Sequence, residues 1–324
     1  MRTIYSLDAT ALEADLILTI GSFDGVHRGH QYLLQQLVQR ARDTKRLSAA
    51  LTFHPHPRVV LQPEVRPVYL STPEERAAIL ESLGLDMLVV LAFTRQLADT
   101  PAEAFIANLH TKLRMRELWV GPDFALGRGR SGNMAALQAL AQRLGYELRI
   151  ISPLLEGNEP ISSTRIRLLL SGGKVDEAAR LLGRPYTLSG QVSQGARRGR
   201  TLGFRTANLH LDPTRAMPAN GVYAVWALLR GDGASGLPRH YPAVANVGVR
   251  PSFDAGERLL EVHLLDYEGD LYGKDLAIQF IQWLRAERRF EDAAHLVQQI
   301  QQDIATARTV LGLWTSADER GGRL

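Results

Sequence analysis

The chain has 324 residues and a formal net charge of +4, with 45% hydrophobic and 22% charged residues. Chains of this length usually hold two domains, and this composition excludes disordered and collagen-like proteins. There are no cysteines, which excludes disulfide scaffolds, thiolate catalysis and metal sites built on sulfur.

The charge is spread evenly along the chain. Division after Gly183 leaves 21 basic and 19 acidic residues, then 17 and 15, so each part carries +2. The pI near 9.5 makes a nucleic-acid-binding protein an alternative, but neither part has the concentrated basic stripe that such binding uses.

No apolar run spans a bilayer, and acidic residues interrupt the first stretch where a signal peptide would be apolar. We expect a cytoplasmic protein that binds small molecules rather than nucleic acid or membrane, as a monomer or an oligomer.

Apolar strand-like runs alternate with amphipathic helical stretches as far as Gly183. The pattern predicts alternating strands and helices over residues 16–20, 31–41, 49–53, 73–83, 87–91, 117–120, 134–144, 147–151 and 164–170, with a further helix that starts at 100–103. This alternation predicts a parallel α/β sheet. Two helix starts carry a threonine cap, a proline and a capping-box glutamate, at residues 72–75 and 100–103, and Gly84 is placed to end the first of these helices.

After Gly183 the pattern changes to short strands divided by Gly, Pro and Asn. Strands are predicted over residues 188–192, 223–229, 243–247, 259–265 and 277–281, followed by a helix over 291–311. These elements predict a small β barrel with a C-terminal helix laid over it. The domains are therefore expected at 1–183 and 184–324.

A glycine-rich turn follows the strand 16–20. Gly21, Gly25 and Gly29 allow backbone amides to approach an anion closely, and the helix start beyond them favours negative charge. His27 and His30 are three residues apart, so both imidazoles are expected to face one phosphate and to stabilise charge on a five-coordinate phosphorus. An ordinary turn with two surface histidines is the alternative for this segment alone.

A second helix start carries Ser162, Ser163 and Thr164, whose hydroxyls and amides suit phosphate binding. Arg167, three residues after Thr164, is placed to clamp the β and γ phosphates and to neutralise the departing pyrophosphate. Taken by itself, the segment would be a structural cap followed by a solvated arginine.

The second half contains a candidate phosphoryl-transfer site. Gly199 and Gly203 suit a flexible flap over phosphates, while the Thr206 hydroxyl and Asn208 side chain, two residues apart on one strand face, are candidates to hold Mg²⁺ and the terminal phosphates of ATP. Each of these features alone would more often be a turn or a cross-strand bond.

Taken together, these motifs resemble the family of bacterial bifunctional riboflavin kinase/FAD synthetases. The segment Phe23-Asp24-Gly25-Val26-His27-Arg28-Gly29-His30 is similar to the H-x-G-H signature of nucleotidylyltransferases, and further motifs follow in family order at 53–57, 120–124, 161–167, 199–209, 220–224, 245–248, 261–266 and 269–273. The resemblance implies a Rossmann-like FMN adenylyltransferase domain followed by a riboflavin kinase barrel. The implied substrates and products are ATP, riboflavin, FMN and FAD.

The resemblance also assigns residues. It places Gly21, Phe23, Asp24 and Gly25 at the ATP of the first site, and it places Phe53, His54, Pro55, Asp123 and Phe124 on its flavin side. In the kinase it implies that Glu261 accepts the proton of the ribityl 5′-hydroxyl, and that Arg285, Glu287 and Phe290 form a lid over the flavin. His54 and His56 have no third ligand nearby, so we expect a proline-stiffened loop there rather than a zinc site.

One residue departs from the family pattern. Where the family has Pro-Thr-Ala-Asn, this chain has Arg205-Thr206-Ala207-Asn208, so a flexible cation replaces a residue that fixes φ. Our hypothesis is that kinase activity survives with an altered ATP or Mg²⁺ dependence. The alternative is an FAD synthetase whose barrel is an impaired kinase or only binds flavin.

Overall fold

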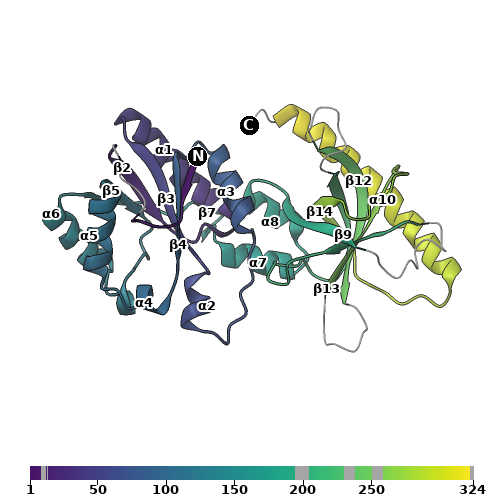
Figure 1. The fold of residues 1–324 in the computed structure, drawn as a ribbon. Helices are drawn as coiled ribbons and strands as arrows, with labels where there is room; N and C mark the ends of the chain where they lie inside the picture. Colours follow the sequence, from purple (N-terminus) through teal and green to yellow (C-terminus); the bar gives the residue numbers. More distant parts are fainter. Residues whose placement is uncertain (9–11, 13, 194–203, 230–237, 250–257, 322–324) are drawn as a thin grey trace. The chain divides into compact units, whose positions relative to one another are not determined.

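The computed structural model describes residues 1–8, 12, 14–193, 204–229, 238–249 and 258–321. The chain divides into two compact units, Met1–Ser163 and Thr164–Leu324, shown in Figure 1. Each unit has its own sheet. The boundary that we predicted at Gly183 falls directly after a helix of the second unit.

The first unit is built on a six-stranded sheet in the order β1-β4-β3-β2-β5-β6. Every neighbouring pair in it is parallel. Its strands are β1 (Arg2–Ile4), β2 (Leu16–Ile20), β3 (Leu47–His54), β4 (Met87–Ala92), β5 (Met115–Val120) and β6 (Glu147–Ile150). Its α-helices are α1 (Arg28–Asp43), α2 (Pro57–Leu61), α3 (Pro73–Ser82), α4 (Arg95–Ala98), α5 (Ala102–Lys112) and α6 (Met134–Leu144). A short pair, β7 (Leu155–Glu156) and β8 (Glu159–Pro160), completes the unit.

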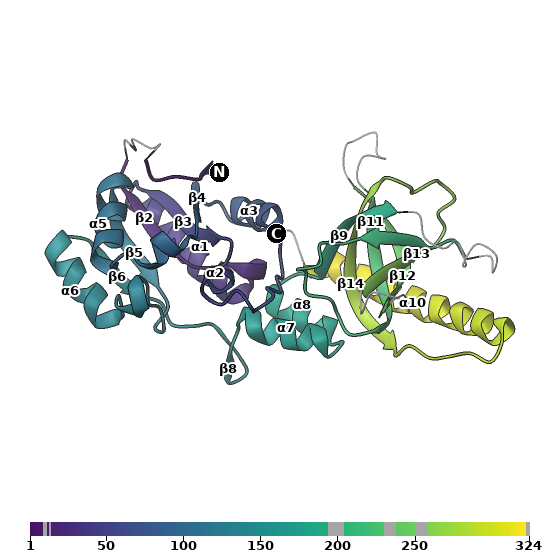
Figure 2. The same ribbon diagram turned by 60° about the horizontal axis from the view of Figure 1, so that its bottom comes forward.

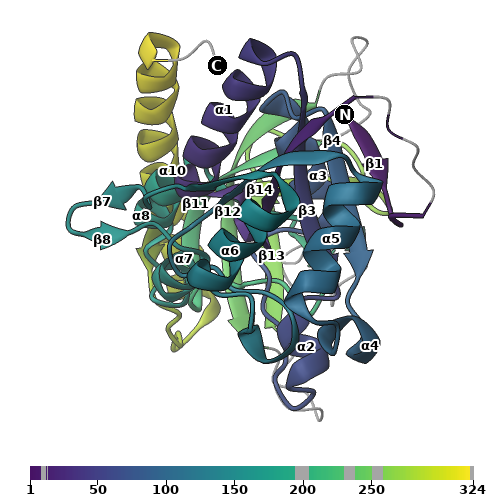
Figure 3. The same ribbon diagram turned by 90° about the vertical axis from the view of Figure 1, so that its left-hand side faces the viewer.

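Helices cover both faces of this sheet because its strands are apolar on both faces. Leu18 of β2 packs in the cluster that contains Ile106 of α5 and Leu137 of α6, while Ile17, its neighbour, packs with Leu34 of α1 on the other face. All five residues of β2 are buried. In Figure 3, α5 and α6 lie in front of the sheet. The arrangement is the doubly wound α/β fold that the alternation predicts.

The sheet order identifies where this fold binds ligands. From β2 the chain continues outward through β3 and β4, and then returns to place β5 on the other side of β2. In open α/β sheets, ligands bind beyond the carboxyl ends of the strands at the point where the order reverses. Here that point lies between β2 and β5, so the turn after Ile20 and the loop after Val120 flank it.

The second unit contains a closed antiparallel barrel in the order β10-β13-β12-β11-β14-β9, seen in Figure 2. The strands are β9 (Tyr186–Ser193), β10 (Ala207–His210), β11 (Gly221–Leu229), β12 (Arg239–Val249), β13 (Arg258–Leu264) and β14 (Asp275–Arg285). Alternate residues fill the interior: Tyr223, Val262 and Ile278 are fully buried there. The intervening residues of each strand face outward.

Among the described residues of the second unit, the helices are α7 (Ser163–Ser171), α8 (Val175–Leu182) and α10 (Ala293–Gly321). Ala307 and Leu311 of α10 pack on Ala224 and Ile281, on the outer wall of the barrel. This confirms the predicted helix over the barrel, although it extends well beyond residue 311.

Of the two capping boxes that the sequence predicts, the one at residues 72–75 forms and the one at residues 100–103 does not. Thr72 and Glu75 exchange both bonds of a capping box, and Gly84 follows that helix with φ +81. At the second site α5 begins at Ala102 without a side-chain cap, because the Thr100 hydroxyl instead donates to the Gln96 carbonyl of the preceding helix.

Candidate functional site

The turn after β2 has an unusual backbone. Phe23 (φ 47), Gly25 (φ 75) and Val26 (φ 38) all lie in the left-handed region. This conformation is rare for a β-branched residue such as Val26, and it persists only where surrounding contacts impose it. The turn leads directly into α1, so its backbone is shaped around a helix N-terminus.

The Asp24 carboxylate supplies contacts that hold this turn. It is buried and accepts hydrogen bonds from Leu70 N (3.0 Å), Ser71 N (3.1 Å) and Ser71 Oγ (3.3 Å). The buried Arg76 guanidinium of α3 lies 3.8 Å from it. Asp24 therefore anchors the turn to residues 70–76, and a contact with ATP remains a prediction for this side chain.

His27 and His30 are brought together as predicted. His27 caps α1, because its Nδ1 accepts a 3.3 Å hydrogen bond from the His30 backbone N–H. The two rings are stacked with centroids 3.7 Å apart and planes 17° apart. Gly29 permits this geometry, since a Cβ there would lie 3.1 Å from His27 Nδ1. The stacked pair thus stands at a helix N-terminus beside the sheet's reversal point.

Burial and nearby positive charge act on His30. Burial lowers the pKa of His30 well below its ordinary value, and electrostatic repulsion of a second proton in the His27–His30 pair and the positive charge of Arg76 lower it further. Two buried nitrogens in this region, His30 Nδ1 and Arg76 Nε, have no hydrogen-bond partner among the described residues. A region of this kind favours an anionic ligand, which would supply acceptors and compensate the positive charge.

The predicted flavin-side residues lie at or just beyond the carboxyl ends of β3 and β5, the two strands that flank β2. Phe53 is the penultimate residue of β3, and its ring packs against Phe93 (5.4 Å between centroids) and Phe105 (6.3 Å). Phe124 is partly buried and packs against the apolar cluster that also contains Phe105. His54 and Asp123 are exposed, and Pro55 is half-buried between His54 and the cap of α2. These positions leave the flavin assignment untested.

The second predicted phosphate motif is divided between the two units. The Ser163 hydroxyl donates a 2.8 Å hydrogen bond to the Asp24 carbonyl, so it reaches the glycine-rich turn. Ser162 is half-buried beside it. Thr164 and Arg167 belong to the second compact unit, so their assignment to ATP rests on the resemblance alone.

The barrel places the predicted kinase residues on adjacent strands. Asn208 of β10 is directly opposite Glu261 of β13, and Glu261 is directly opposite Asn246 of β12. Residues paired in this way have Cβ atoms about 4.5–5.5 Å apart. Their neighbours Ala207, Val262 and Ala245 are buried in the interior, so the row Asn208, Glu261, Asn246 faces outward.

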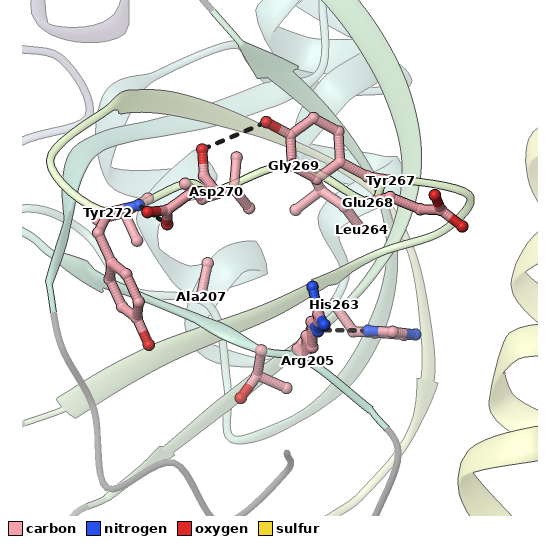
Figure 4. Close-up of a pocket in the computed structure, with 12 residues that line it drawn as sticks. Arg205, Ala207, His263, Leu264, Tyr267, Glu268, Gly269, Asp270 and Tyr272 are labelled. Atoms are coloured by element: carbon pink, nitrogen blue, oxygen red, sulfur yellow. Dashed lines mark hydrogen bonds between the residues drawn. The ribbon is translucent and has the colours of Figure 1, made fainter.

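A pocket of about 820 Å³ is lined by residues at the start of β10, at the end of β13 and in the loop that follows β13. Its lining includes Thr206 and, labelled in Figure 4, Arg205, His263 and two residues of the loop between β13 and β14, Asp270 and Tyr272. The volume lies within the range of small-molecule sites. Thr206, which stands two residues before Asn208, thus connects the pocket to the polar row.

Arg285 is held by a buried partner. Its guanidinium makes a bidentate ion pair with the buried Asp303 of α10, with contacts of 2.7–3.1 Å, and it lies 5.8 Å from the Phe290 ring. The Glu287 carboxylate lies directly against Gly248, where a side chain would collide with it. These contacts tie residues 285–290 to the barrel, and contact with flavin stays a prediction. Gly199 and Gly203 lie outside the described residues.

Two kinds of residue escaped sequence analysis. Ser71 and Arg76 lie about fifty residues from Asp24 and carry no motif signal, and Asn246 was part of a quoted motif but received no role. Only the strand register or the tertiary contact identifies them.

Two further features bear on the class of protein. Within the described ranges no cluster of three or more His, Cys, Asp or Glu side chains is arranged to hold a metal ion. None of the helices searched there has the length and apolar character that a bilayer crossing requires.

The chain matches two family models. The model described as FAD synthetase matches residues 9–165, and the one described as riboflavin kinase matches residues 182–311.

Full-length relatives agree with both models. The bifunctional riboflavin kinase/FMN adenylyltransferase of Escherichia coli K12 is 37% identical to this chain, and the alignment covers 97% of this chain and 98% of that protein. The protein of the same name from Pseudomonas fluorescens is 38% identical over 91% and 92%. A crystal structure from Streptococcus pneumoniae, named as a macrolide-efflux protein, superposes with a TM-score of 0.86 at 30% identity, over 94% and 98%. The chain therefore belongs to the family that joins an FAD synthetase to a riboflavin kinase.

Proposed function

We propose that the two units catalyse successive steps of FAD formation. The barrel phosphorylates riboflavin to FMN with ATP, and the α/β unit joins AMP to FMN, which gives FAD and pyrophosphate. The observation that carries the adenylyl-transfer assignment is the stacked His27–His30 pair at the N-terminus of α1. Family membership carries the pairing of the two activities.

In the adenylylation, an FMN phosphate oxygen attacks the α-phosphorus of ATP in line, and pyrophosphate leaves. His27 Nδ1 accepts the His30 amide hydrogen, so the ring hydrogen of neutral His27 resides on Nε2, where it serves as a donor. The two imidazoles and the N-terminus of α1 stabilise the charge that develops on the phosphorus oxygens. Arg167 with the hydroxyls of Ser162, Ser163 and Thr164 would bind the departing phosphates, and Phe53, His54, Pro55, Asp123 and Phe124 would contact the flavin.

In the kinase, the pocket beside Thr206 would take ATP with its terminal phosphate toward the Asn208–Glu261 row. Glu261 accepts the proton of the ribityl 5′-hydroxyl as that oxygen attacks the γ-phosphorus, the bond from the γ-phosphorus to the bridging oxygen breaks, and ADP leaves. The donor atoms of Thr206 and Asn208, a hydroxyl and an amide oxygen, fit Mg²⁺. Because Mg²⁺ commonly keeps waters and binds substrate phosphates, two protein oxygens suffice for such a site. When bound, the ion neutralises charge on the β and γ phosphates.

The narrower alternative, a barrel that binds flavin without phosphorylating it, rests on Arg205 alone. The relatives from Escherichia coli and Pseudomonas fluorescens are both named as bifunctional enzymes, so they do not favour this alternative over the bifunctional assignment. We also keep the domain boundary near Gly183, a cytoplasmic location and small-molecule partners as proposals; the start of the riboflavin kinase match at residue 182 supports the first.

The test is to measure FMN and FAD separately after incubation with riboflavin, ATP and Mg²⁺. His30→Ala should spare FMN formation from riboflavin, and Glu261→Ala should spare FAD formation from supplied FMN. Loss of both activities in either folded variant would contradict the division of labour, and a barrel that forms no FMN would support the narrower alternative.

A further inference from the structure

The segment that leads into β10 carries Thr206 and is therefore critical for the kinase site. Its preceding residue is Arg205, which leaves φ free where a proline would restrict it. Both Arg205 and Thr206 are exposed and precede the first paired residue of the strand, Ala207. Strand pairing alone therefore does not fix the position of the Thr206 hydroxyl.

One side chain contacts this segment from the neighbouring strand. His263 Nδ1 lies 2.8 Å from the Arg205 carbonyl oxygen, as the dashed line in Figure 4 shows. A carbonyl oxygen only accepts, so Nδ1 carries the hydrogen and donates it. The His263 ring also meets the edge of the Phe204 ring, with centroids 5.7 Å apart and planes 89° apart.

The position of His263 relates this bond to the reacting groups. His263 is two residues after Glu261 on β13, so both side chains leave the same outer face of the strand. It also lines the pocket together with Arg205 and Thr206. The ring therefore connects the strand that carries the proposed base to the segment that carries Thr206.

We propose that His263 is a positioning residue for phosphoryl transfer, which places Thr206 by holding the Arg205 carbonyl. The Arg205 carbonyl and the Thr206 nitrogen belong to one planar peptide group, so fixing the oxygen fixes the orientation of the whole plane. That plane determines where the Thr206 side chain points relative to Asn208. The inference rests on the proposed kinase activity of the barrel.

The experiment compares four full-length variants in riboflavin phosphorylation at varied MgATP. His263→Ala removes the donor and the ring, His263→Phe retains a ring without the donor, and His263→Asn retains an N–H near the position of Nδ1. His210→Ala, an exposed histidine on β10, is the matched control. FAD formation from supplied FMN is measured on each preparation as an internal control for folding.

We expect His263→Ala and His263→Phe to raise KM for MgATP roughly fivefold, the value of one hydrogen bond of ordinary strength. His263→Asn should stay within about twofold of the parent, as should His210→Ala, and FAD formation should be unchanged throughout. If the phenylalanine variant matches the parent, or if alanine changes nothing, the proposal is overturned. An enzyme that makes no FMN before any substitution would instead refute the proposed kinase function.

A second readout needs neither nucleotide nor metal. Hydrogen exchange of a peptide covering residues 204–209 should be faster in His263→Ala than in the parent, with exchange across 186–192 unchanged. Arg205→Pro keeps the carbonyl and restricts φ, so the KM effect of His263→Ala should shrink in that background. Unchanged exchange at 204–209, or an equal KM effect in both backgrounds, would show that His263 does not position this segment.

Discussion

Gly29→Ala isolates the geometry of the histidine pair from the stability of the helix that carries it. Gly29 is the second residue of α1 and does not have a positive φ, so alanine can adopt its backbone conformation. An added Cβ would lie 3.1 Å from His27 Nδ1, 3.2 Å from its Cε1 and 3.4 Å from the Ile161 carbonyl oxygen. The His27 ring must therefore move by a few tenths of an ångström, away from its stacking position on His30.

Two contributions to stability oppose each other in this variant. Alanine is favoured over glycine within a helix by about 1 kcal/mol, and weakening the His27 cap costs about 1 kcal/mol. Catalysis has no such compensation. Complete loss of one donor to a developing oxyanion costs about 10²–10³ in rate, so a displaced donor should lower kcat/KM for FAD formation by about 10–100-fold.

The assay is FAD formation from FMN and ATP, with riboflavin phosphorylation and the urea unfolding midpoint measured on the same preparation. Gly312→Ala is the matched control, because Gly312 is also helical and an added Cβ there would meet nothing within 4 Å. The control should leave both activities unchanged. If Gly29→Ala forms FAD at the parent rate, the stacked pair does not act through its present geometry.

Three further changes test other parts of the structure. Glu117 is fully buried in β5, where Arg40 (3.1 Å), Arg46 (2.7 Å) and the Trp119 indole N–H (3.0 Å) contact its carboxylate. In urea unfolding, Glu117→Ala should lower the stability of the first unit by about 3–5 kcal/mol. Glu117→Gln should lower it by less. Unfolded His30 takes up a proton near its ordinary pKa of 6.5 while folded His30 does not, so the unfolded state binds more protons below that pH and stability falls as the pH is lowered. His30→Asn should remove this part of the acid sensitivity, and an unchanged pH dependence of the unfolding midpoint between pH 7.5 and 5 would contradict it. Asp303→Asn breaks the bidentate pair with Arg285 and should lower both barrel stability and riboflavin phosphorylation while FAD formation from FMN persists.

Local signals explain how much of the first site was predictable. His27, Gly29 and His30 lie within four residues after a buried strand, so spacing and chain order were enough to place them together. The contact of Asp24 with Arg76 could not be found in this way, because it forms only when α3 packs beside the turn. The signature therefore placed the two histidines together and missed Arg76, whose charge acts on His30.

Element length and capping explain the gaps in the predicted fold. The strands β1 and β10 have three and four residues, so an alternating pattern has few residues in which to stand out, although β6, also of four residues, was predicted as part of 147–151. The helix α8 begins at Val175 without a side-chain cap, so no start signal marks it. Longer elements with regular burial, such as α6 and β2, have the predicted bounds.

The two sites also differ in what keeps them assembled. In the first unit one turn carries both histidines, whereas in the barrel the row Asn208, Glu261, Asn246 draws one residue from each of three strands. A shift of register by one residue would turn Glu261 inward and bring Val262 to the outer face. The complete burial of Val262 opposes that shift, so interior packing holds the kinase groups in place. This is why the kinase motifs occur as short separated strings, while the adenylyltransferase signature is continuous.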